Sequence, residues 1–69
     1  MVDHVYRLSE VVGSSRIGVD DAIKNAVRRA AEGTPDLEWF QMQEVRGQMV
    51  DGEVAYFQVA LKLGGRISE

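Results

Sequence analysis

Few side chains of this 69-residue chain could do covalent or metal chemistry. There is no cysteine, so a thiol nucleophile and a thiolate metal site are excluded. The single histidine, His4, has no partner histidine, which favours a surface or interface residue over a zinc ligand. Asp20 and Asp21 complement a helix dipole better than they form a catalytic pair, and no glycine-rich phosphate loop precedes them. We therefore expect a binding protein and not an enzyme.

The length and composition predict a small domain that depends on other copies of itself. A chain of 69 residues has a large surface for its volume and buries little apolar area on its own. Its hydrophobic share of 45% is still ample for a core. Because disulfides and thiolate metal sites are excluded, oligomerisation is the remaining way to stabilise the fold. Residues 1–69 form one expected domain, since no repeat, linker or low-complexity segment divides them.

Charge and hydropathy argue against nucleic-acid and membrane partners. Eight basic residues are scattered among eleven acidic ones, and the net charge is -3, so no broad cationic face is available for a nucleic-acid backbone. No apolar run approaches the ~20 residues needed to cross a bilayer. The N-terminus also lacks a signal-peptide pattern. Together with the lack of cysteine, this predicts a cytoplasmic protein.

Side-chain periodicity predicts an α+β fold with the element order β-α-β-β. His4–Val12 is rich in β-branched and aromatic residues and predicts a strand. Apolar residues then repeat at helical spacing from about Ile17 to Glu32. Two further strands, Glu38–Val50 and Glu53–Leu63, flank Asp51-Gly52, the dipeptide that most readily forms a type I′ hairpin turn.

The expected helix has sequence signals at both ends. Gly13-Ser14-Ser15 ends the first strand, and one of its serines is placed to accept a backbone N–H at the helix N-terminus. Arg28 and Arg29 would fall in the last turn, where they complement the negative end of the helix dipole. Gly33 is placed to take a left-handed C-terminal cap, and the proline that follows prevents continuation.

The hairpin turn also fixes how its two strands pair. Val50 lies opposite Glu53, and the remaining partners follow from that constraint. Three pairs then form a mainly apolar face that suits the helix: Phe40 with Leu63, Met42 with Leu61, and Arg46 with Phe57. The predicted subunit core on that face consists of Phe40, Met42, Phe57, Val59 and Leu61.

The other face of the hairpin carries an unusual mixture of aromatic and amide side chains. Its members are Trp39, Gln41, Gln43 and Val45 with Lys62, Ala60, Gln58 and Tyr56. Adjacent residues of a strand point to opposite sides, so Trp39 and Phe40 cannot both belong to the core of one small subunit. Trp39 therefore needs a partner outside its own subunit. From composition alone, a dry subunit contact is favoured over a cofactor role, because tryptophan is enriched at interfaces.

Arg46 has two interpretations. Strict alternation places it on the helix face, where a buried guanidinium needs an ion-pair partner such as Glu44 or a helix carboxylate. A β-bulge at Arg46-Gly47 would instead turn it outward and leave it available to a phosphate group. The sequence leaves both open.

Six short segments, taken in order and at their spacing, resemble the dodecin family, and the resemblance covers nearly the whole chain. The segments are His4-Val5-Tyr6, Val12-Gly13-Ser14-Ser15, Gly18-Val19-Asp20, Leu37-Glu38-Trp39-Phe40, Val45-Arg46-Gly47 and Phe57-Gln58-Val59. The resemblance implies subunits in which a three-stranded antiparallel sheet wraps around one helix. It further implies that twelve subunits assemble into a hollow homododecamer.

The resemblance also implies a flavin site formed by Trp39, Gln58, Arg46 and Arg66. In dodecins, flavin rings stack in pairs between symmetry-related tryptophans and a glutamine contacts them, which gives these roles to Trp39 and Gln58. Arg46 and Arg66 match family arginines and are candidates to contact the phosphate tail of FMN or coenzyme A. An indole face suits a planar ring, and an amide suits the donor and acceptor edge of the flavin pyrimidine. Trp39 and Gln58 lie on one face but ~20 Å apart along the strands, so a shared site must cross a subunit boundary.

Two places depart from the family pattern. Gly33-Thr34-Pro35-Asp36 replaces the usual basic and apolar linker, and Gly65 stands where the family usually has phenylalanine. The first is expected to alter the loop near the pocket. The second removes an aromatic ring, which is expected to weaken either a subunit contact or a ligand wall. Neither changes Trp39 or Gln58.

The expected function is flavin binding, storage and sequestration, with photoprotective quenching of the flavin by the stacked tryptophan. FMN or riboflavin is the expected ligand, with FAD and lumichrome as further candidates. The alternative is a flavin-free structural shell or a coenzyme A-binding shell. Gln58 then serves as an ordinary polar contact, and Arg66 as a solvated residue near the chain end.

Overall fold

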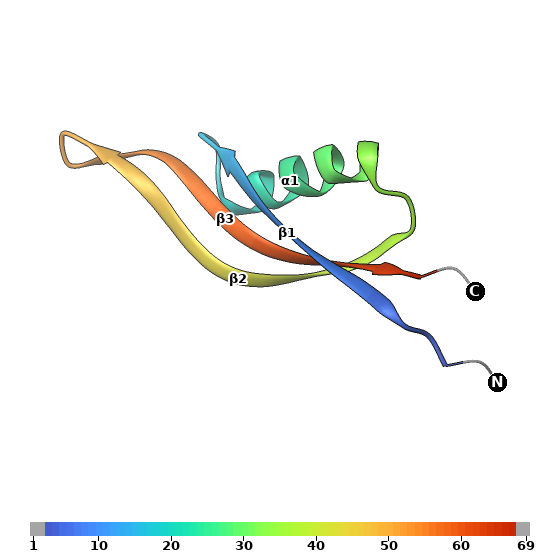
Figure 1. Ribbon diagram of the computed structural model, residues 1–69. Helices are drawn as coiled ribbons and strands as arrows, with labels where there is room; N and C mark the ends of the chain where they lie inside the picture. The colour runs from blue at the N-terminus through green and yellow to red at the C-terminus, as the bar shows by residue number, and fades with distance from the viewer. Residues whose placement is uncertain (1–2, 68–69) are drawn as a thin grey trace.

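The elements follow the predicted order in the computed structural model, which describes residues 3–67. β1 (Tyr6–Ser15), α1 (Val19–Gly33), β2 (Leu37–Val50) and β3 (Glu53–Arg66) form an antiparallel sheet in the order β1-β3-β2, with α1 against one face (Figure 1). This confirms the α+β fold with a three-stranded sheet and one helix. The molecule measures 55 × 20 × 14 Å, since the β2–β3 hairpin extends past the end of α1 (Figure 1).

Long strand pairing extends β1 and β3 beyond the predicted limits. Gly13-Ser14-Ser15, which we expected to end the first strand, pairs with residues 57–59 of β3 and belongs to β1. β3 likewise continues past Leu63 to Arg66, opposite Tyr6. Ladder hydrogen bonds to a neighbouring strand outweigh the turn propensity of glycine and serine here.

Ser15 organises the turn before α1. Its Oγ accepts hydrogen bonds from the backbone N–H groups of Ile17 at 2.9 Å and Gly18 at 3.4 Å, and it donates to Asp21 Oδ2 at 2.7 Å. The N-cap residue is Gly18, which has no side chain to cap the helix, so the predicted serine holds the preceding turn and not the helix itself. Asp20 and Asp21 do lie in the first turn, as predicted.

The C-terminal end of α1 differs from the expectation. The helix includes Gly33, so Arg28 and Arg29 lie before its last turn, which contains no basic residue. Gly33 is not in the left-handed region; the loop instead places Asp36 there, with φ 65°. A short aspartate tolerates this conformation better than most side chains, which explains why the loop turns at that residue.

The hairpin turn confirms the prediction at its tip. Asp51 and Gly52 both have positive φ, 51° and 79°, as a type I′ turn requires, and Val50 pairs with Glu53. The predicted partners Phe40–Leu63 and Met42–Leu61 are also observed.

Farther along β2, strict alternation fails. The register shifts between Met42 and Glu44 and shifts back between Gln48 and Met49. Arg46 therefore pairs with Gln58 and not with Phe57, and Val45 pairs with Val59. The first irregularity inserts one extra β2 residue and exchanges the two faces for the segment that follows.

The core lies between α1 and the β1–β3 pair. Its buried members are Ala22, Ala26, Val59, Leu61 and Leu63. Close approach of helix and strand requires a glycine at position 13, since a Cβ on Gly13 would lie 2.5 Å from the Ala22 carbonyl oxygen and 2.6 Å from Ala26 Cβ. The predicted core residues Val59 and Leu61 are therefore confirmed, and Met42 and Phe57 are half-buried.

The prediction that Phe40 belongs to the subunit core was wrong. It shares the helix side of the sheet with Leu63, but it is 50% exposed because β2 is an edge strand that α1 does not cover. Val45, opposite the buried Val59, is 52% exposed on the same side. We call Phe40 and Val45 the β2 apolar strip. Among residues 3–67, no helix is long and apolar enough to cross a membrane.

Candidate functional site

Trp39 lies on the face of the sheet that α1 does not cover, as predicted. It pairs with the buried Gly64, and a Cβ at Gly64 would fall within its indole. The ring of Tyr6 from β1 lies beside it, with ring centroids 5.9 Å apart and planes inclined at 59°. The indole therefore rests on a glycine and remains 39% exposed, which leaves area for a planar ligand to stack.

Next to this indole, one carboxylate joins β1 to the end of β3. Glu38 Oε1 accepts a hydrogen bond from the Tyr6 hydroxyl at 3.2 Å, and Glu38 Oε2 lies 2.9 Å from Arg66 Nη2. The Arg66 side chain is 43% exposed. Arg66 is therefore ion-paired within the subunit, near Trp39, and is not simply solvated.

Gln58 lies on the same face, in a row of polar residues across the sheet. Its partners are Ser14 of β1 and Arg46 of β2. A cavity of about 390 Å³ adjoins this row and is lined by Ser14, Ser15, Arg16, Tyr56 and Gln58. The amide thus has both a cationic neighbour and an adjoining open space.

The shifted register settles the position of Arg46. It points to the uncovered face, beside Gln58, although the irregularity lies at Met42/Glu44 and not at the predicted Arg46-Gly47. Its Nη1 lies 3.6 Å from Glu44 Oε1, which is the ion pair that one interpretation expected. Both side chains are more than half exposed, so this pair contributes little to stability.

The four predicted site residues therefore form two separate pairs. Trp39 lies with Arg66 at one end of the sheet, and Gln58 lies with Arg46 toward the other. Gly64 and Gln58 are six positions apart on β3, or ~20 Å at ~3.3 Å per residue. We refer to these two pairs below as the Trp39 half-site and the Gln58 half-site. Within residues 3–67, no three metal-ligating side chains gather at one place.

Sequence reasoning assigned no role to Tyr6 and Glu38. Finding them requires the β1–β3 register, in which Tyr6 pairs with Arg66. A helix connects β1 to the hairpin, so no short turn fixes that register in the way Asp51-Gly52 fixes the other. Glu38 stands at a register shift between Leu37 and Trp39, which breaks simple alternation there.

Comparison with known proteins extends the sequence resemblance. The family model described as Dodecin matches residues 5–68. The chain belongs to the dodecin family. It is 38% identical over 65 residues to the curated dodecin of Thermus thermophilus, which covers 94% of each chain. Dodecins are small oligomeric proteins that bind and store ligands.

Solved dodecin structures agree in fold. The dodecin from Streptomyces coelicolor is 54% identical, with a TM-score of 0.92 over 100% of this chain and 99% of that one. The dodecin from Streptomyces davaonensis is 46% identical, with a TM-score of 0.92 over 99% and 100% of the two chains. A Thermus thermophilus dodecin variant with a tryptophan replaced by phenylalanine is 36% identical, with a TM-score of 0.90 over 97% and 100%.

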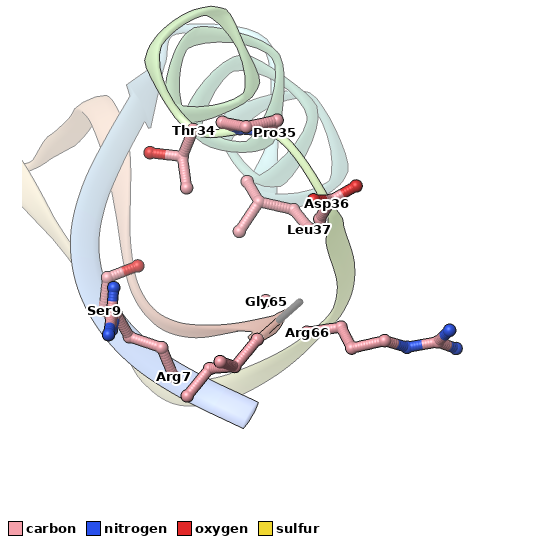
Figure 2. Close-up of a pocket in the computed structure, with 9 residues that line it drawn as sticks. Arg7, Ser9, Thr34, Pro35, Asp36, Leu37, Gly65 and Arg66 are labelled. Atoms are coloured by element: carbon pink, nitrogen blue, oxygen red, sulfur yellow. The ribbon is translucent and has the colours of Figure 1, made fainter. Parts of the chain in front are cut away.

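The two departures from the dodecin pattern meet in space. Thr34, Pro35 and Asp36 line one cavity of about 440 Å³ together with Gly65 (Figure 2). A Cβ at Gly65 would stand 3.4 Å from Leu37 Cδ2, in ordinary contact. The lining includes neither Trp39 nor Gln58. Arg66 belongs to the lining, but its side chain extends away from the cavity (Figure 2). The altered loop and the lost aromatic ring therefore change one local region, which meets the Trp39 half-site only at Arg66, whose backbone N–H donates to the Asp36 carbonyl oxygen at 3.1 Å.

Proposed function

We propose that this dodecin binds and stores flavin in a homododecameric shell, with FMN or riboflavin stacked between Trp39 side chains of neighbouring subunits. The proposal rests on the position of the Trp39 side chain. Its indole rests on Gly64, away from the helix, with a large exposed area. A subunit that needed Trp39 only for its own core would bury this ring under α1. Family membership supports the same ligand class.

The exposed apolar surface supports the assembly. The β2 apolar strip lies uncovered on the helix side, while Leu8 and Val12 of β1 are 53% and 58% exposed on the other side. Apolar area on both faces of a small sheet is typical of a subunit with several neighbours. We expect light scattering to give a closed dodecamer at micromolar concentration. A monomer or plain dimer would contradict the proposed shell.

The two half-sites account for the need for several subunits. Trp39 supplies the stacking plane, and Gln58 supplies the amide donors and acceptor that suit the polar edge of the ring. Because they lie ~20 Å apart in one subunit, a ligand that contacts both must lie between subunits. Flavin binding and assembly are therefore coupled in this proposal.

For a phosphate tail, as in FMN or coenzyme A, Arg46 is the better placed arginine. Its 3.6 Å pair with Glu44 is exposed and weak, so a phosphate replaces it at low cost. Arg66 is held at 2.9 Å by Glu38, and its role toward a phosphate requires breaking that closer pair. We assign the tail first to Arg46 and second to Arg66.

The proposed physiological role is sequestration with photoprotection. A bound flavin supplies an acceptor that, once excited by light, takes an electron from the stacked indole and so loses its fluorescence. Trp39 is the single tryptophan of the chain, so it is the only residue that can supply the electron-donating indole at each site. We propose no catalytic turnover of the ligand.

Substitution of Trp39 tests the function directly. Trp39→Ala removes the stacking plane without touching the buried core, so the assembly should persist while flavin affinity falls about tenfold or more and quenching is lost. Trp39→Phe keeps a smaller ring and should give an intermediate affinity. Fluorescence titration with riboflavin and FMN measures both effects, and light scattering measures size.

Two outcomes would contradict the proposal. If Trp39→Ala binds and quenches flavin as the parent does, the stacking residue is misassigned. If the parent protein is colourless and takes up no added flavin, the flavin-free or coenzyme A-binding shell is favoured, and coenzyme A binding by calorimetry separates those two.

A further inference from the structure

Trp39, Tyr6 and Glu38 form a continuous chain of contacts that the proposed stacking role does not require. The Tyr6 ring lies 5.9 Å from the indole between centroids, and its hydroxyl donates to Glu38 Oε1 at 3.2 Å. Arg66 holds the other carboxylate oxygen, Oε2, at 2.9 Å. An indole is thus linked through a phenol to an anionic proton acceptor.

We infer that Tyr6 is a redox partner that restores Trp39 after the indole has lost one electron. Tyr6 gives one electron to the Trp39 radical cation and passes its phenolic proton to Glu38 Oε1. The products are neutral Trp39, a neutral Tyr6 phenoxyl radical and a protonated Glu38. The Tyr6 O–H bond breaks and an O–H bond forms on Glu38, so charge and atoms balance.

The physical basis is the acidity of an oxidised phenol. Removing an electron from a tyrosine makes its hydroxyl a strong acid, so a base within hydrogen-bond distance makes the transfer faster and more favourable. Glu38 meets that requirement, because its Oε1 receives the Tyr6 hydroxyl while Arg66 fixes Oε2. Arg66 is here a positioning residue that keeps Oε1 directed at the phenol.

Tyr56, the second tyrosine, lacks both features. Its hydroxyl donates to Gln48 Oε1 at 2.9 Å, and an amide accepts a hydrogen bond but does not take up a proton at neutral pH. Within its own subunit it is also eight positions from Gly64 on β3, or ~26 Å at ~3.3 Å per residue. Tyr56→Phe is therefore a matched control for Tyr6→Phe.

The inference rests on the proposed function only for its physiological oxidant, which is light-excited flavin. The cycle closes when that electron returns to Tyr6 and Glu38 returns the proton. The chemistry among Tyr6, Trp39 and Glu38 needs no flavin and is testable with another one-electron oxidant. Its consequence is that the radical leaves the indole before water or oxygen attacks the ring.

The test uses the assembled, flavin-free protein and azidyl radical generated by pulse radiolysis, which oxidises indole to its radical. The absorption bands of the tryptophanyl and tyrosyl radicals are followed in time. The parent and Tyr56→Phe should show decay of the first with matched growth of the second, at a rate independent of protein concentration. Tyr6→Phe should lose this conversion. An unchanged conversion in Tyr6→Phe would overturn the inference.

Glu38→Gln provides a second variant that keeps both aromatic rings. Conversion of the tryptophanyl to the tyrosyl radical should be slower than in the parent. The rate in the parent should differ between H2O and D2O, and this difference should be lost in Glu38→Gln. A parental rate in Glu38→Gln would refute the proton transfer. In flavin-loaded protein under light, Trp39 of Tyr6→Phe should be oxidised faster than Trp39 of the parent, as measured by mass spectrometry. If the protein binds no flavin, the proposed function is wrong, but the result of the azidyl experiment is unaffected.

Discussion

Replacing Gly64 by alanine would place a methyl group where the Trp39 indole now lies. A Cβ at this position overlaps ring atoms of the indole and points away from α1. Gly64 does not have positive φ, so the backbone accepts alanine. The side chain of Trp39 must therefore swing off the sheet, which its 39% exposure permits.

The expected loss follows from the stacking geometry. Each aromatic contact is worth about 0.5–1.5 kcal/mol beyond area burial, and in the proposed site two symmetry-related indoles are displaced together. The sum of about 1–3 kcal/mol corresponds to a fall in flavin affinity of roughly five- to a hundredfold. The buried core stays intact because Leu63 and Leu61 face the other side.

The assay combines fluorescence titration of riboflavin with near-ultraviolet circular dichroism, for which Trp39 is the only indole reporter. Gly65→Ala is the matched control, since its Cβ makes only an ordinary contact of 3.4 Å with Leu37. The control should bind flavin like the parent. If Gly64→Ala shows an altered indole signal but binds flavin with the parental affinity, the contact between Gly64 and the indole is not required for stacking.

Three further predictions concern stability, the phosphate tail and assembly. Gly13→Ala should lower the free energy of unfolding by about 1–3 kcal/mol in denaturant titration because it overpacks the helix contact, and a neutral effect would contradict this packing. FMN should bind about tenfold to a hundredfold more tightly than riboflavin, and less so in high salt. Arg46→Ala should remove that preference more fully than Arg66→Ala, and equal affinities in the parent would assign both arginines to structure. Phe40→Asp should reduce the oligomer size in light scattering, since the ring is 50% exposed in the subunit, and unchanged size would place the β2 apolar strip outside the contacts.

Local signals predicted the hairpin well. Asp51-Gly52 requires two positive φ angles, and that requirement fixes both the turn and the nearby pairs Phe40–Leu63 and Met42–Leu61. The same pairing placed Trp39 on the uncovered face, which is the most informative feature of the site. The order of elements followed from periodicity for the same reason: each pattern is local.

The errors share a different cause, which is that tertiary pairing overrides local preference. The shift at Met42/Glu44 leaves no sequence signal strong enough to place it, yet it moves Arg46 beside Gln58. Phe40 was expected in the core because alternation gives its side but not the reach of the helix. The Tyr6–Glu38 contact joins residues 32 positions apart through a register that no turn defines.

The separation of the two half-sites has a thermodynamic consequence. A flavin that contacts Trp39 of one subunit and Gln58 of another binds the assembly and not the lone subunit. Such a ligand stabilises the oligomer by RT ln(1 + [L]/Kd), about 2.7 kcal/mol at a free concentration of a hundred times Kd. In the proposed shell, subunit contacts would also cover exposed apolar area such as the β2 apolar strip. Weakening the β2 apolar strip should therefore lower flavin affinity although Phe40 and Val45 lie on the opposite side of the sheet from Trp39.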